Sequence, residues 1–64
     1  MVARWEFYTL ANMLLSTHGD DAEAEAARRL HRAEETNDRG QVVVWFEVQK
    51  LLPGIREERE QRGG

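Results

Sequence analysis

Two short segments carry the signals that start an α-helix, and they constrain the fold of this chain more than any other feature. Asp20-Asp21-Ala22-Glu23 and Asp38-Arg39-Gly40-Gln41 each place an aspartate where it can accept hydrogen bonds from the free amides of a first turn. In each segment a Glu or Gln three residues later can reach back to the cap. The two signals therefore predict three helices, near residues 3–17, 21–35 and 39–52.

Each expected helix has one face of apolar residues at helical spacing. The first face consists of Phe7, Leu10, Ala11, Leu14 and Leu15. The second consists of Ala22, Ala26, Leu30 and Ala33, whose small side chains favour close packing. The third consists of Val44, Val48, Leu51 and Leu52, with Trp45 at its edge. We expect Leu14, Leu30, Val44 and Val48 to form the core, and Gly19 to end the first helix in a left-handed conformation.

Several large apolar residues fall outside these faces. They are Trp5, Met13, Val42, Val43 and Phe46. A helix that is apolar on both sides is normally buried on both sides. In so small a chain, we expect one side of the third helix to contact something outside the fold.

Residues 42–46 also have the composition of a buried strand, and aromatic residues alternate with polar ones over residues 4–9. A strand at 42–46 would need the first segment, or a second chain, as its partner. The cap at Asp38 and the helical spacing favour helix instead. Pro53-Gly54 is expected to stop or kink that helix, and the half-charged residues 56–64 are expected to fray or to be disordered. The predicted architecture is an all-α, compact three-helix domain over residues 1–55, followed by a flexible charged tail over residues 56–64.

Length and composition limit how this domain is stabilised and where it works. A chain of 64 residues buries a small core, and with no Cys it lacks the disulfides that often reinforce small folds. Association with a second copy is the remaining support, so a homodimer is expected. No charged segment followed by an apolar one opens the chain, and no apolar run approaches the length of a membrane span. We expect a cytoplasmic protein that does not contact membranes.

A search for reactive groups predicts a protein that is not an enzyme. His18 and His31 are 13 residues apart without Cys or a spaced His partner, so neither a metal site nor a bound cofactor is expected. Nucleophile motifs and phosphate-binding glycine loops are absent from the sequence. The terminal Arg62-Gly63-Gly64 is similar to the tails of ubiquitin-like carriers, but those proteins have a β-grasp fold that this pattern does not support.

Several short motifs resemble a family of very short, uncharacterised bacterial proteins of alphaproteobacterial type, a domain of unknown function. The motifs are Thr17-His18-Gly19-Asp20, the Ala-rich segment with Arg28 and Arg29, the turn Asn37-Asp38-Arg39-Gly40, and the following stretch with Trp45. The resemblance covers residues 8–48, and the chain has Asn37 where the family tends to have Gly. It implies a three-helix fold and a bacterial origin, and it implies no catalytic residue.

Two functions from different classes follow from these patterns. The first is a small, non-catalytic protein-interaction module, self-associating or bound to another protein, with Trp5, Val42, Val43 and Phe46 as contact residues. The alternative is a small nucleic-acid-associated regulator that uses Arg28, Arg29 and Arg32. A formal net charge of −3 and a short basic patch argue against nucleic acid as the partner.

Overall fold

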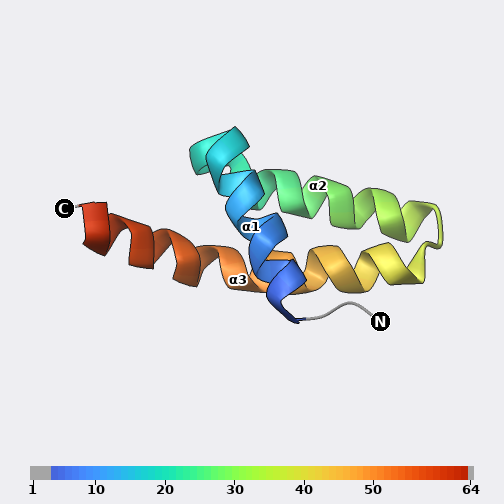
Figure 1. Ribbon diagram of the computed structural model, residues 1–64. Coiled ribbons are helices and arrows are strands. Elements are labelled where there is room, and N and C mark those ends of the chain that lie inside the picture. Colours follow the sequence, from blue (N-terminus) through green and yellow to red (C-terminus); the bar gives the residue numbers. More distant parts are fainter. Residues whose placement is uncertain (1–3, 64) are drawn as a thin grey trace.

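The computed structural model describes residues 4–63, and the elements in that range are all helical (Figure 1). They are α1 (Arg4–His18), the short 3₁₀-helix η1 (Gly19–Asp21), α2 (Ala22–Glu35) and α3 (Arg39–Gly63). The prediction of an all-α protein is confirmed. Residues 4–9 and 42–46 are both helical, so the strand alternatives are wrong.

The first half of the chain is one helical stretch with a sharp bend, rather than two helices separated by a capped turn. Gly19 ends α1 in the left-handed region, with φ of 56°, as its lack of a side chain allows. However, η1 and α2 follow at once. Asp20, the predicted cap, lies inside η1, and neither η1 nor α2 has a side-chain cap hydrogen bond. The predicted capping box at residues 20–23 is therefore wrong. Ion pairs engage its acidic groups instead: Asp21 binds Arg28 and Glu23 binds Arg56.

The turn between α2 and α3 follows the local signals closely. Asn37 has φ of 56°, its N–H donates to the carbonyl of Glu34, and the N–H of Asp38 donates to the carbonyl of Ala33. These two bonds form the Schellman motif that ends a helix. The carboxylate of Asp38 accepts a 3.1 Å hydrogen bond from the N–H of Gln41, which confirms Asp38 as the cap of α3. The predicted return bond from the Gln41 side chain is wrong, because that side chain accepts a hydrogen bond from the indole N–H of Trp45 instead.

Helix α3 does not end at Pro53, contrary to the sequence-based prediction, and it crosses the expected domain boundary at residue 55 without a break. Pro53 is exposed, while its neighbours Leu52 and Ile55 are buried on the opposite side of the helix. Beyond them, Arg56 forms a 3.1 Å ion pair with Glu23, and Arg59 donates a 2.6 Å hydrogen bond to the side chain of Asn12. Burial and these contacts outweigh the hydrogen bond that proline removes.

Helices α2 and α3 lie antiparallel, and α1 crosses both (Figure 1). Because α3 is the longer helix, its later half extends past the start of α2. One core joins the three: Ala11, Leu14, Leu15, Ala22, Ala26, Val44, Trp45, Val48, Leu52 and Ile55. Leu14, Val44 and Val48 are buried as predicted. Leu30 is only half-buried at the margin of the core, so its prediction as a core residue is wrong.

Two glycine substitutions test this backbone because they are expected to act in opposite directions. An alanine Cβ at Gly54 meets no atom within 4 Å, so Gly54→Ala should raise the free energy of unfolding by about 0.5–1 kcal/mol through helix propensity. Gly19→Ala should lower it by about 1 kcal/mol, because φ of 56° strains any residue with a Cβ. Urea unfolding at one protein concentration measures both. Equal effects of the same sign would contradict the bend at Gly19.

Candidate functional site

The side of α3 that faces away from the core carries a stripe of exposed residues, which we call the outer stripe. It consists of Arg39, Val43, Phe46, Lys50, Pro53 and Glu57, spaced alternately four and three residues apart. All six are exposed, and this spacing keeps them on one side of a helix. Because the buried residues of α3 occupy the other side, the outer stripe faces away from α1 and α2.

The middle of the outer stripe is apolar, and a single cation, the ammonium of Lys50, lies beside it. Val43 is 56% exposed and Phe46 is 50% exposed, values that large apolar side chains in a packed core would not have. Val42 is half-buried at the margin. The ammonium of Lys50 lies 4.8 Å from the centroid of the Phe46 ring and 3.0 Å from a carboxylate oxygen of Glu47. Val42, Val43 and Phe46 thus lie together, as the sequence predicted.

Trp5, the fourth predicted contact residue, lies on another helix. It is 66% exposed near the start of α1 and shares its side of that helix with Tyr8 and Asn12, which follow at helical spacing. Tyr8 and Asn12 line a shallow recess against residues 55–62 of α3, and the outer stripe does not include that part of the surface. Met13, also on α1, is 44% exposed.

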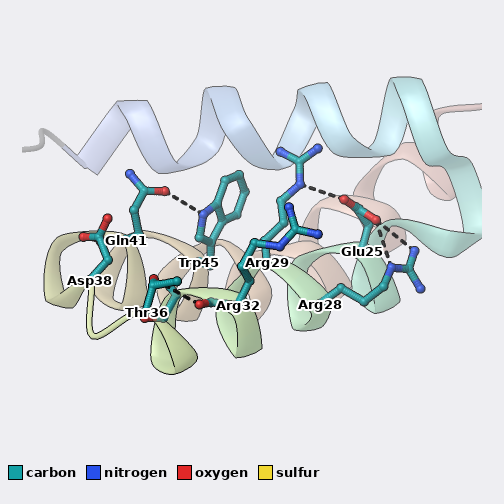
Figure 2. A pocket seen from close by; sticks show the side chains of 9 residues that line it. Glu25, Arg28, Arg29, Arg32, Thr36, Asp38, Gln41 and Trp45 are labelled. Atoms are coloured by element: carbon teal, nitrogen blue, oxygen red, sulfur yellow. Dashed lines mark hydrogen bonds and ion pairs between the residues drawn. The ribbon is translucent and has the colours of Figure 1, made fainter.

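A polar groove between α2 and α3 gathers the three arginines that were candidates for nucleic-acid contact (Figure 2). The groove has a volume of about 470 Å³, and its lining residues are Glu25, Arg28, Arg29, Arg32, Ala33, Thr36, Asp38, Gln41 and Trp45. The sequence predicted that Arg28, Arg29 and Arg32 share one side of a helix, and they do. It did not predict the residues from α3 that close the groove.

Most of the positive charge in this groove is neutralised within the chain. Figure 2 shows Glu25 bound to both Arg28 and Arg29, with N–O distances of 2.9 and 2.8 Å, and Arg28 also pairs with Asp21 at 2.8 Å. Arg32 is exposed and makes no ion pair within residues 4–63. The carboxylates of Glu25 and Asp38 line the groove with the three guanidinium groups, and Asp21 pairs with Arg28 from outside it. The net positive charge available to attract a phosphate backbone is therefore small.

Arg29 packs against the ring of Trp45 in the wall of this groove. The indole is only 8% exposed, its N–H donates a 2.9 Å hydrogen bond to the side chain of Gln41, and the guanidinium of Arg29 lies 4.9 Å from the ring centroid. Arg29 thus joins Glu25 and Trp45 in one stack, in which a cation–π contact and an ion pair hold the guanidinium. The sequence placed Trp45 at the edge of its helical face, and it missed this stack. The spacing of Gln41 and Trp45, four residues apart on a helix, is the signal that could have indicated their bond.

Residues 4–63 contain no group of three or more histidine, aspartate or glutamate side chains arranged to hold a metal ion. Buried polar or charged residues are also absent from this range. None of the helices in the described range is long and apolar enough to cross a membrane.

The two arginines beside Glu25 should give this carboxyl a measurable signature. Hydrogen bonds from Arg29 and then Arg28 lower the pKa of Glu25 from 4.5 to about 2. The stabilisation by these ion pairs is therefore complete above pH 4.5 and is lost as the pH falls from 4.5 to about 2. The melting temperature of the wild type should fall on acidification over this pH range, and Glu25→Gln should remove that contribution. Glu34→Gln, at an exposed position of the same helix, should retain the contribution. Identical pH profiles for the wild type and Glu25→Gln would contradict the assignment.

Comparison with protein-family models, with curated proteins and with solved structures finds no match to this chain. The resemblance to short bacterial proteins thus stays a prediction from the motifs in the sequence.

Proposed function

We propose that this protein is a small interaction module that associates with a second copy of itself through the outer stripe of α3. The observation that carries the proposal is the exposure of Val43 and Phe46 on the side of α3 opposite the core. Single exposed apolar residues are common on protein surfaces. Here two large ones lie one turn apart on the longest helix, beside the half-buried Val42 and the exposed Pro53.

The small core supports this proposal. Ala11, Ala22, Ala26 and Ala33 are four of its buried residues, and the largest fully buried side chains are only Leu14, Leu52 and Val48. Burial of apolar area contributes about 25 cal/mol per Å², so an alanine-rich core of this size provides limited stability. Covering Val43 and Phe46 in a dimer would add apolar burial that the single chain does not have.

The proposal assigns no catalytic role, and it does not depend on Trp5 or on the arginine groove. Trp5 lies outside the outer stripe, on α1. In the groove, Glu25 holds two of the three arginines that the nucleic-acid alternative would use. Binding to another protein through the same stripe would rest on the same exposed residues, and the concentration dependence described next separates it from self-association.

Self-association predicts that the melting temperature rises with protein concentration, because only the folded dimer benefits from mass action. We expect Phe46→Lys to abolish this dependence and to shift the sedimenting species to monomer. The matched control is Met13→Lys, which places the same charge on an exposed apolar position of α1 and should leave both measurements unchanged. A wild-type protein that sediments as a monomer at several hundred micromolar would contradict the proposed function.

A further inference from the structure

We infer that the two copies pack their outer stripes against each other in antiparallel orientation, about a two-fold axis at the level of residue 48. This inference rests on the proposed function and specifies its geometry. The occupant of the exposed face is a second copy of the chain. Complementarity between the two ends of the outer stripe is the observation that carries the inference.

The outer stripe is symmetric in position about residue 48 and complementary in chemistry. Arg39 and Glu57 lie nine residues to either side of it, Val43 and Pro53 lie five, and Phe46 and Lys50 lie two. In an antiparallel pair, residues at equal distance from the axis face each other across the interface. Arg39 then meets Glu57, Val43 meets Pro53, and Phe46 meets Lys50, and the symmetry makes each pair twice.

Each of these pairs is chemically favourable. Arg39 and Glu57 carry opposite charges at the exposed ends of the stripe, and Val43 and Pro53 are both apolar. A lysine over a phenylalanine ring is a cation–π pair, and within one copy Lys50 already lies 4.8 Å from the Phe46 centroid. The two Phe46 rings would be about 6 Å apart along the helix axis, given a rise of about 1.5 Å per residue, so they can also contact each other.

Other arrangements of the same stripe bring like charges together or place the Glu57 carboxylate against the Phe46 ring. A parallel pair would place Arg39 opposite Arg39, Lys50 opposite Lys50 and Glu57 opposite Glu57. If the two helices of an antiparallel pair slide past each other by one heptad, so that the axis moves toward the start of α3, Arg39 lies opposite Lys50. If they slide the other way, Phe46 lies opposite Glu57. The alternating spacing of four and three residues is also that of the contact positions in an antiparallel coiled coil. The register about residue 48 is therefore favoured over its neighbours.

Reversing the charges at the two ends of the stripe tests this register. Arg39→Glu and Glu57→Arg should each weaken the dimer by about tenfold, because each creates two contacts between like charges. The double variant R39E/E57R restores opposite charges in both pairs and should return the dissociation constant to within about threefold of the wild type. Sedimentation equilibrium measures all four proteins. Arg4→Glu and Glu34→Arg, both at exposed positions outside α3, control for the change in net charge.

A distance measurement gives the orientation independently. Because the chain has no cysteine, Gln61→Cys introduces a single site for a spin label, 13 residues from position 48. Antiparallel packing should separate the two labels by about 40 Å along the helices, whereas parallel packing would bring them side by side. A short distance between labels, or a double variant as weak as the single ones, would overturn the inferred geometry while self-association stands. A monomeric wild type would overturn the proposed function and this inference together.

Discussion

The packing of the alanine face of α2 against α3 is the contact on which the rest of the structure depends. The buried residues of α2 are Ala22, Ala26 and Ala33, which are small enough to allow a close approach of the two helices, and α3 contributes larger buried side chains. This close approach fixes which side of α3 faces inward. It also leaves the opposite side, with Val43 and Phe46, exposed to solvent.

Electrostatics supports the same helix pair. The stack of Glu25, Arg29 and Trp45 joins α2 to α3 along one edge, and Arg56 joins the later half of α3 to the start of α2 through Glu23. Exposed ion pairs individually contribute little, but Arg29 also covers the indole of Trp45, which adds dispersion and cation–π energy to the ion pair. The basic cluster on α2 therefore has a structural explanation, and this favours the outer stripe as the interacting surface.

Local signals in the sequence predicted the structure correctly where a residue interacts only with the backbone of its own turn. Gly19 and Asn37 adopt the left-handed conformation that ends a helix, and Asp38 caps α3, because each needs only the backbone within a few residues. The periodicity of apolar residues likewise predicted the exposure of Phe46 and Val43. The predicted box at residues 20–23 failed because the chain passes from α1 through η1 into α2 without a break. Asp21 and Glu23 instead pair with Arg28 and Arg56, which a local motif does not reveal.

The sequence by itself determined the helical character of the chain, its turn between α2 and α3, and which apolar residues α3 directs outward, since helical spacing and local hydrogen bonds decide these. Only the tertiary structure decided that α3 continues through Pro53, because the burial of Leu52 and Ile55 and the contacts of Arg56 and Arg59 with other helices offset the missing hydrogen bond. It also decided the position of Trp45 and the neutralisation of Arg28 and Arg29. Each of these depends on a partner that lies close in space, and helical spacing within one segment does not identify that partner.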